Sequence, residues 1–215
     1  MQIAFDAFGT LFDIDWLRQP ARELAGERGD DLYDAFYARL QPWTWLITAA
    51  DAYVPLPELA AMAFESAAAE VELDVDTGAL VDKLTELPPF PDAEPALQSL
   101  SGHSLAVLSN GTRDGLEQLL SNAGIRDHFD HVLPADSVGR YKPAPEVYGL
   151  AARAFGVDPE EVTLVSSNPW DAAGAKLSGL RSVWVSRGRP MAPVLGVAPD
   201  DVVEDLTGLT FAARR

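Results

Sequence analysis

The feature that most constrains the fold is an apolar run, Gln2–Phe5, that stops at Asp6 and leads into Gly9 and Thr10. Such a run predicts a short buried strand whose carboxyl end presents a carboxylate on a turn. In open parallel α/β sheets the reactive groups lie at these strand ends. Asp6 is therefore a candidate covalent nucleophile. Two residues further on, where a second acid could stand, the chain carries Phe8.

Strand-like and helix-like segments alternate along most of the chain. Buried strands are predicted at 2–5, 104–108, 131–133, 163–165 and 182–185, and helices near 112–123, 145–155 and 169–178. Repeated β-α alternation predicts an α/β fold, in which a Rossmann-like parallel sheet carries helices on both faces.

One long segment breaks this alternation. Residues 15–88 show helical periodicity, as in Leu32, Phe36 and Leu40, and no convincing strand. We predict an inserted all-helical cap subdomain over 15–88 and a core built from 1–14 and 89–215. The proline-rich stretch at 88–91 is expected to form the return linker, because consecutive prolines stop a helix and stiffen the chain.

Composition excludes several functions. The 215 residues carry a net charge of −17, with 33 acidic side chains and only three lysines, which argues against nucleic acid and anionic membranes as partners. The sequence contains no run of 18 apolar residues, so it does not predict a membrane span. Without cysteine there is no disulfide framework or thiolate metal site, and a cytoplasmic location fits. Salt relieves self-repulsion of this size, so a salt-rich cytoplasm and an ordinary acidic enzyme both stay open.

Polar side chains also follow three later strand-like segments. They are Ser109 and Asn110, then Lys142, and then Ser166, Asn168 and Asp171. Each group has a plain structural explanation. The first fits a turn with a helix cap at Thr112, and a loop lysine is usually solvated. The last fits a helix that starts with Asn168 as its N-cap and an acid at Asp171.

Taken together, these four strand ends resemble the haloacid dehalogenase superfamily of hydrolases, and within it the type II 2-haloacid dehalogenases. The resemblance covers nearly the whole chain, including the helical insert. It rests on the strings Asp-x-x-Gly-Thr-Leu-Phe-Asp, Ser-Asn-Gly, Lys-Pro-x-x-x-x-Tyr and Ser-Asn-x-Trp-Asp, which begin at positions 6, 109, 142 and 167.

Charge separates the dehalogenase branch of this superfamily from its phosphatases. Phosphatases place a second Asp two residues after the nucleophile and hold Mg²⁺ with further acids in the last motif. Here those places are Phe8 and the run 166–168, Ser-Ser-Asn. The proton donor for an alcohol leaving group is therefore missing, and too few oxygen ligands remain for Mg²⁺. A halide leaves without protonation, so we expect alkyl displacement without a metal or other cofactor.

The resemblance implies a mechanism. Asp6 would attack the halogen-bearing carbon of a short-chain 2-haloacid, and water would then release the 2-hydroxy acid with inverted configuration. Lys142 would offset the charge on Asp6, and Asp171 would help activate water. The further expected roles are water placement by Ser166 and Asn168, substrate carboxylate binding by Ser109, halide contact by Asn110, support by Thr10 and Tyr148, and apolar walls from Phe8 and Trp170.

One departure from the family concerns the halide. The family carries an arginine on the second cap helix that is thought to bind halide, and here that place is Tyr37. Arg39 is nearby but lies on another face of a helix. Either residue is a candidate substrate contact, and a weakly active homologue is a third outcome.

Two other functions stay open. One is a related hydrolase of another small anionic substrate, such as a phosphate ester, and the other is a binding module without activity. The expected partner is a small-molecule halogenated carboxylate, and the sequence is compatible with a homodimer.

Overall fold

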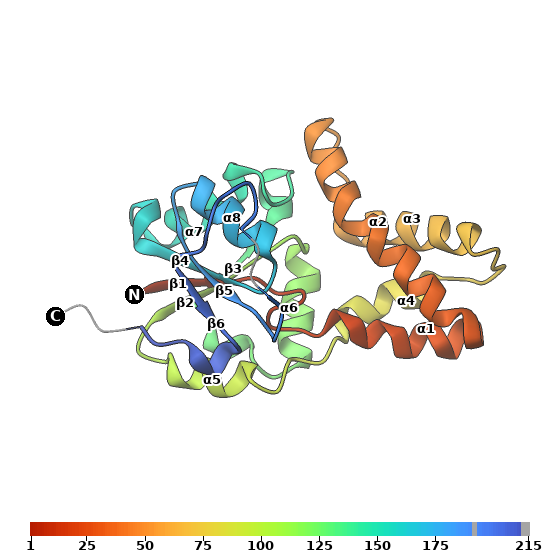
Figure 1. Ribbon diagram of the computed structural model, residues 1–215, viewed down its shortest axis with the longest axis horizontal. Helices are drawn as coiled ribbons and strands as arrows, with labels where there is room; N and C mark the ends of the chain where they lie inside the picture. The colour runs from red at the N-terminus through yellow and green to blue at the C-terminus, as the bar shows by residue number, and fades with distance from the viewer. Residues whose placement is uncertain (191–192, 212–215) are drawn as a thin grey trace.

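The computed structural model describes residues 1–190 and 193–211. Among these residues a six-stranded parallel sheet forms the core, and helices inserted after the first strand form a second body beside it (Figure 1). The sheet order is β3-β2-β1-β4-β5-β6. The strands are β1 Gln2–Phe5, β2 Ser104–Ser109, β3 His131–Pro134, β4 Val162–Ser166, β5 Arg181–Val185 and β6 Asp201–Val203. The predicted α/β fold is confirmed.

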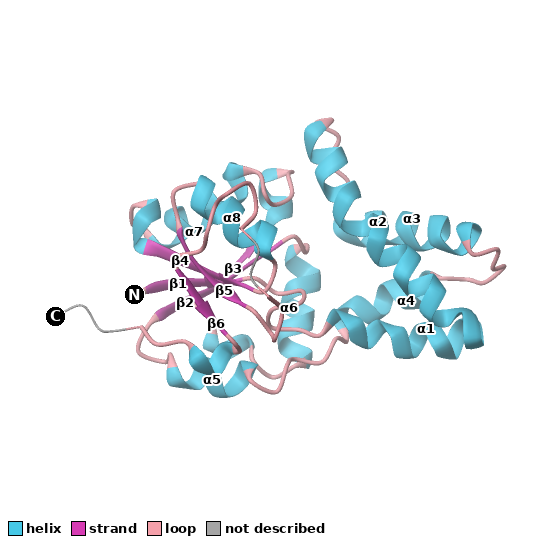
Figure 2. Ribbon diagram, in the orientation of Figure 1, coloured by secondary structure: helices cyan, strands magenta, loops and turns pink. Residues whose placement is uncertain are grey.

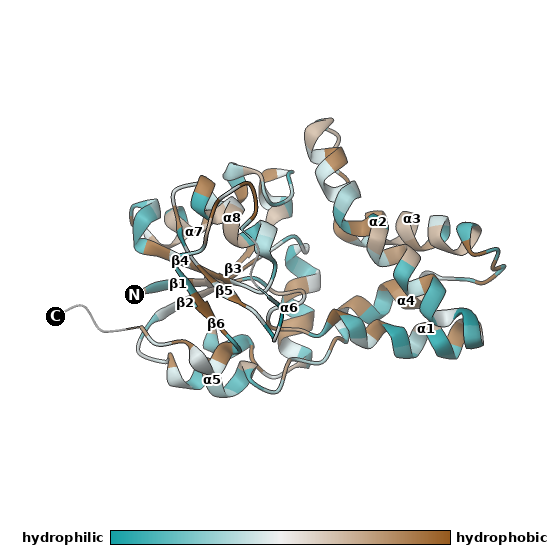
Figure 3. Ribbon diagram, in the orientation of Figure 1, coloured by the Kyte–Doolittle hydropathy of each residue, from teal (hydrophilic) through white to brown (hydrophobic). Residues whose placement is uncertain are grey.

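Helices cover both faces of the sheet (Figure 2). Helices α5 (Ala93–Ser99) and α6 (Arg113–Asn122) pack on the face that carries Phe5. Helices α7 (Pro145–Phe155) and α8 (Pro169–Leu177) pack on the opposite face, with Ala4. Successive side chains of a strand point to opposite faces, so strands buried on both sides are largely apolar, and parts of the sheet are brown in Figure 3.

Each predicted strand and helix of the core begins and ends within two residues of the observed element. Two core elements, β6 and α5, were not expected from the sequence. Strand β6 is a short edge strand of three residues, and its first two residues are exposed. It therefore lacks the apolar run by which the other strands are recognised.

The insert contains four α-helices: α1 Arg18–Ala25, α2 Gly29–Ala49, α3 Leu56–Glu70 and α4 Gly78–Asp82. Helices α2 and α3 pack together through the stacked rings of Phe36 and Phe64, whose centroids are 3.6 Å apart. No helix in the described part of the chain combines the length and apolarity that crossing a bilayer requires.

The insert, called the cap below, is bonded to the core at its covalent connections and also at places farther from them. At its covalent connections, the N–H of Asp13 donates to the Pro88 carbonyl at 3.0 Å and the N–H of Phe90 donates to the Leu11 carbonyl at 2.8 Å. Elsewhere, the Tyr141 hydroxyl donates to the carbonyl of Val54 at 2.6 Å, in the segment between α2 and α3. The limits 15–88 of the cap stay a prediction. The bonds from Asp13 to Pro88 and from Phe90 to Leu11 join the chain just before residue 15 to the chain around residue 88.

Candidate active site

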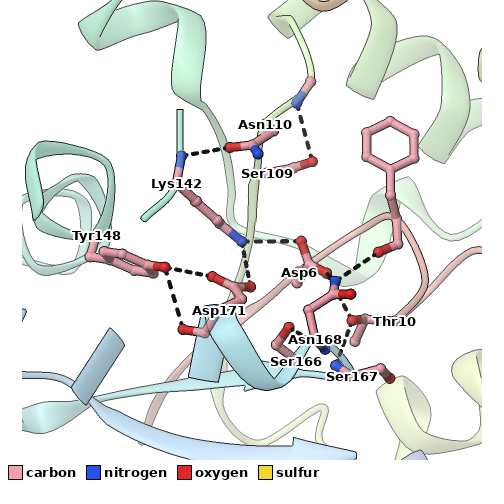
Figure 4. Close-up of polar contacts among 12 residues, drawn as sticks. Asp6, Thr10, Ser109, Asn110, Lys142, Tyr148, Ser166, Ser167, Asn168 and Asp171 are labelled. Atoms are coloured by element: carbon pink, nitrogen blue, oxygen red, sulfur yellow. Dashed lines mark hydrogen bonds and ion pairs between the residues drawn. The ribbon is translucent and has the colours of Figure 1, made fainter. Parts of the chain in front are cut away.

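Asp6 lies at the carboxyl end of β1, in the middle of the sheet, and is almost completely buried. Three side chains donate to its carboxylate (Figure 4). The Thr10 hydroxyl and the Asn168 amide each donate to Oδ2 at 2.9 Å, and the Lys142 ammonium donates to Oδ1 at 3.1 Å. The carboxylate is therefore held in one orientation by donors on both oxygens.

Lys142 is a buried cation between two carboxylates. Its side chain is 1% exposed, and its Nζ lies 3.1 Å from Asp6 Oδ1 and 3.0 Å from Asp171 Oδ2. The other oxygen of Asp171 accepts from the Tyr148 hydroxyl at 2.7 Å. The predicted group of Asp6, Lys142, Tyr148 and Asp171 is thus brought together by β1, the loop before α7, α7 and α8. The loop lysine is not solvated.

Burial and charge act against each other in this group. Burial raises the pKa of Asp6, and the Lys142 ammonium opposes that rise. Burial alone would lower the pKa of Lys142, but the carboxylates of Asp171 and Asp6 outweigh it and raise that pKa. The ammonium is therefore retained through neutral pH, and it favours the ionised form of Asp6.

The segment before α8 does not cap that helix in the way the sequence indicates. Asn168 occupies the N-cap position, but its side chain makes no capping bond. Its amide instead reaches back to Asp6 and, at 3.2 Å, to the Phe8 carbonyl. The Ser166 hydroxyl accepts from the N–H of Asn168 at 3.1 Å, and Thr10 Oγ1 accepts from the N–H of Ser167 at 2.8 Å. The tertiary contact to Asp6 replaces the local cap.

The two predicted site residues at the end of β2, Ser109 and Asn110, have different environments. Asn110 lines the cavity above Asp6, and its side-chain oxygen accepts from the N–H of Lys142 at 2.8 Å. Ser109 is fully buried, and its hydroxyl accepts from the N–H of Gly111 at 3.3 Å. It does not line this cavity. Thr112 does cap α6, by accepting from the N–H of Gly115.

The cavity, called the Asp6 cavity below, lies between core and cap and has a volume of about 80 Å³. The core contributes Asp6, Phe8, Ile14, Asn110, Asn168 and Trp170, and the cap contributes Tyr37, Leu40, Gln41, Thr44, Leu56 and Leu84. Trp170 also meets Trp45 of the cap edge to face, with ring centroids 5.7 Å apart. One carboxylate, three amides and a mostly apolar wall therefore surround a small space.

Several lining residues were missed from the sequence. Gln41 and Thr44 follow Tyr37 on one face of α2, at spacings of four and seven residues. Once Tyr37 is assigned to the site, helical periodicity predicts these two positions. Nothing in the sequence marks Ile14, Leu56 and Leu84, because their place depends on how the cap packs against the core.

Tyr37 and Arg39 have different environments. Tyr37 lines the Asp6 cavity, is 47% exposed, and stacks on Tyr33 with ring centroids 5.8 Å apart. Arg39 does not line this cavity. Its guanidinium donates to Ser66 Oγ at 3.1 Å and to the Ala35 carbonyl at 2.6 Å, and it pairs with Glu70 of α3. The structure therefore holds Arg39 away from the Asp6 cavity, and its role as a substrate contact stays a prediction.

Within the described ranges 1–190 and 193–211, no three His, Cys, Asp or Glu side chains are grouped so that they could hold a metal ion. Activity without a metal stays a prediction.

Comparison with known proteins assigns the chain to a family. The model of the haloacid dehalogenase-like hydrolases matches residues 2–179. The chain belongs to this family. The Asp6 cavity of this haloacid dehalogenase-like hydrolase lies at the carboxyl ends of the parallel strands.

Relatives of known activity cover almost the same length. The chain is 35% identical to an (S)-2-haloacid dehalogenase of Pseudomonas sp. (strain YL), over 95% of this chain and 90% of that protein. It is 34% identical to haloacetate dehalogenase H-2 of Moraxella sp. (strain B), over 94% and 92% of the two chains. It also resembles the solved L-2-haloacid dehalogenase of Xanthobacter autotrophicus with chloropropionic acid covalently bound. That match has a TM-score of 0.90 and 29% identity over 95% and 94% of the two chains.

Proposed function

We propose that this hydrolase is a dehalogenase that converts 2-haloacids to 2-hydroxy acids with inversion, through an ester on Asp6. The observation that carries the proposal is a buried carboxylate, fixed by Lys142, Thr10 and Asn168, at the floor of a small and largely apolar cavity. Phe8 occupies the place of a second acid, so no acid at this position can protonate a leaving group.

In the first step an oxygen of Asp6 attacks C2 of the substrate from the side opposite the halogen. The new C–O bond forms as the carbon–halogen bond breaks, and the halide departs with the bonding electrons. The amide of Asn110, which lines the cavity, donates to the departing halide, with the Tyr37 hydroxyl as a second neutral donor. Phe8 and Trp170 exclude water, so the carboxylate is less solvated than in bulk.

In the second step water attacks the carboxyl carbon of Asp6. The bond from that carbon to the substrate oxygen breaks, and the 2-hydroxy acid leaves with an oxygen that came from Asp6. Asp171 accepts the proton of the attacking water and returns it to the departing oxygen. Lys142 stabilises the negative charge on the tetrahedral intermediate. Asn168 and Ser166 position the water, and Tyr148 and Thr10 hold the two aspartates in place.

The role proposed for Ser109 differs from direct side-chain contact with the substrate. Its buried hydroxyl holds the N–H of Gly111, so it shapes the turn whose backbone faces the substrate carboxylate. Asn110 on that turn is the side chain that faces the cavity.

A single-turnover reaction in ¹⁸O-labelled water tests the ester. With enzyme in excess over 2-chloropropionate, the label should enter the Asp6 carboxylate and be absent from the first equivalent of lactate. Digestion and mass spectrometry of the peptide that contains Asp6 locate it. Label in the first equivalent of product, with none on Asp6, means that water attacks C2 directly.

We also propose a cellular environment and a partner for this activity. The net charge of −17 supports work in a salt-rich cytoplasm, where ions screen self-repulsion. The same charge argues against nucleic acid and an anionic membrane as partners, and the small Asp6 cavity supports a small-molecule carboxylate instead. A homodimer stays a prediction.

A further inference from the structure

A second cavity lies directly beside the Asp6 cavity. The same three apolar side chains, Phe8, Leu56 and Leu84, line both. The second cavity, called the side cavity below, has a volume of about 370 Å³, against about 80 Å³ for the first. These three side chains therefore form a wall common to both cavities, and the side cavity is the larger of the two.

The side cavity lies between the start of α6 and the end of the cap. The core side carries Gly111, Gly115 and Leu116, and the cap side carries Val81 and Thr85. Gly115 has no side chain to fill the space beside the start of α6, Gly111 lies directly against the Leu116 side chain, and Leu116 and Val81 make the wall apolar. A hydrocarbon group would bury its surface here against side chains from both bodies.

Charge decides which part of a 2-haloacid would enter. Asp82 and Glu86 also line the side cavity. Glu86 is paired with Lys83 at 2.6 Å, and Asp82 has no ion pair with another described residue. A wall with net negative charge disfavours the substrate carboxylate and the departing halide, which are both anions. The neutral alkyl group on C2 is the substituent that this cavity accepts.

We propose that the side cavity binds the alkyl chain of 2-haloalkanoic acids longer than 2-chloropropionate. The inference rests on the proposed function and deepens it by naming the substrate class. C2 sits at Asp6, the carboxylate stays at the Ser109–Gly111 turn, and the chain passes Phe8 and Leu84 into the side cavity. Each methylene buried there should raise kcat/KM by up to about fourfold, from the free energy of burying one CH₂ group.

Filling the side cavity from either wall tests the proposal. Gly115→Leu places a branched side chain in it from α6, and Gly115→Ala is the matched control, since it adds only a Cβ that lies 3.1 Å from Thr112 Oγ1. Thr85→Phe fills the same space from the cap and guards against a folding defect peculiar to α6. The measurement is kcat/KM for the series from 2-chloropropionate to 2-chlorohexanoate, by halide release.

In the unmodified enzyme and in Gly115→Ala, kcat/KM should rise with chain length, and 2-chlorohexanoate should exceed 2-chloropropionate by about tenfold or more. In Gly115→Leu and Thr85→Phe the ratio should fall to about one or below, with the value for 2-chloropropionate unchanged. A flat or falling series in the unmodified enzyme overturns the inference while the proposed function stands. So does a chain-length gain that survives in both filled variants. Absence of turnover for every member overturns the proposed function, and this inference with it.

Discussion

The backbone N–H of Lys142 donates to the side-chain oxygen of Asn110 at 2.8 Å. An amide carries its acceptor and its donors on different atoms, so this bond turns the NH₂ group of Asn110 away from the N–H of Lys142. The loop that supplies the buried cation therefore also fixes the orientation of the amide that we propose as a neutral donor to the halide.

Replacing Asn110 by aspartate tests this orientation. Asn110→Asp keeps an oxygen for the N–H of Lys142 but turns a negative charge toward an anionic substrate and leaving group. We expect kcat/KM to fall by about 10²-fold or more, which is typical for loss of one preorganised donor. Asn110→Ala should also lose stability, by about 1–3 kcal/mol, because the N–H of Lys142 is left unpaired. Urea unfolding separates the two effects, and near-normal turnover by Asn110→Asp would show that the amide faces elsewhere.

The pH profile should report the environment of Asp6. Only the ionised carboxylate attacks, and burial raises its pKa above the ordinary 3.8. Activity should therefore be lost as pH falls, with a midpoint above that of a free aspartate. The raised pKa of Lys142 keeps its ammonium charged up to and beyond pH 10.5, so kcat/KM should stay level through the alkaline range. Initial rates of halide release, measured from acid to alkaline pH, check the acid loss and the level alkaline range.

Thr10 provides a matched test of the same limb. Its hydroxyl bond lowers the pKa of Asp6 against the larger effect of burial. Thr10→Val removes the hydroxyl and should move the acid limb to higher pH, while Thr10→Ser keeps the hydroxyl and should leave the limb where it is. Equal limbs in the two variants would mean that Thr10 does not tune the nucleophile.

Tyr37 should be the weak point of the halide site. A neutral hydrogen bond is about half as strong as a charge-assisted one, so Tyr37→Arg should raise kcat, by about fivefold or more with chlorinated substrates, since chloride is a poorer leaving group than bromide. Tyr37→Phe should lower it. Single-turnover chloride release measures the displacement step directly.

Arg39→Ala is the control for that experiment. Arg39 is engaged with Ser66, Ala35 and Glu70 on the α3 side of the cap, so turnover should be unchanged and stability should fall by up to about 1 kcal/mol. Loss of activity in Arg39→Ala, combined with a silent Tyr37→Phe, would assign the halide to Arg39 instead.

Activity should survive chelation. The position two residues after the nucleophile is Phe8, and an ammonium already occupies the space between Asp6 and Asp171. A hard cation that needs several oxygen ligands would have to displace it. Dialysis against EDTA followed by assay with and without added Mg²⁺ should give equal rates. A rate restored only by Mg²⁺ would favour the phosphatase-like alternative.

Much of the core could be predicted because its signals are local. Five strands are short apolar runs, and polar residues follow four of them, directly or after a loop, on the side of the sheet where the site lies. The order of Asp6, Ser109, Lys142 and Ser166 along the chain therefore specified a shared location without any tertiary information. Strand β6 gave no such signal, since it is an exposed edge strand of three residues.

The rest depends on contacts between distant segments. Capping rules explain Asn168 from its neighbours alone, yet its amide binds Asp6, 162 positions away. Helical spacing could exclude Arg39 from the face of Tyr37, but only the packing of α2 on α3 shows that Glu70 and Ser66 hold it. Likewise, the part played by Leu56 and Leu84 follows from the placement of the cap, which periodicity does not encode.

The two attachments of the cap differ in kind, and this limits how the enzyme can admit a substrate. Near Leu11 and Pro88 the chain itself crosses, twice and side by side, so this attachment cannot separate. Around Tyr141 the two bodies are joined by non-covalent bonds: the Tyr141 hydroxyl bonds Val54, the Tyr141 N–H bonds Thr48 at 3.1 Å, and Arg140 pairs with Asp51 at 2.7 Å. A rotation of the cap about the first attachment would break these bonds. Tyr141 directly precedes Lys142, so one peptide unit joins the residue that bonds the cap to the buried cation of the site.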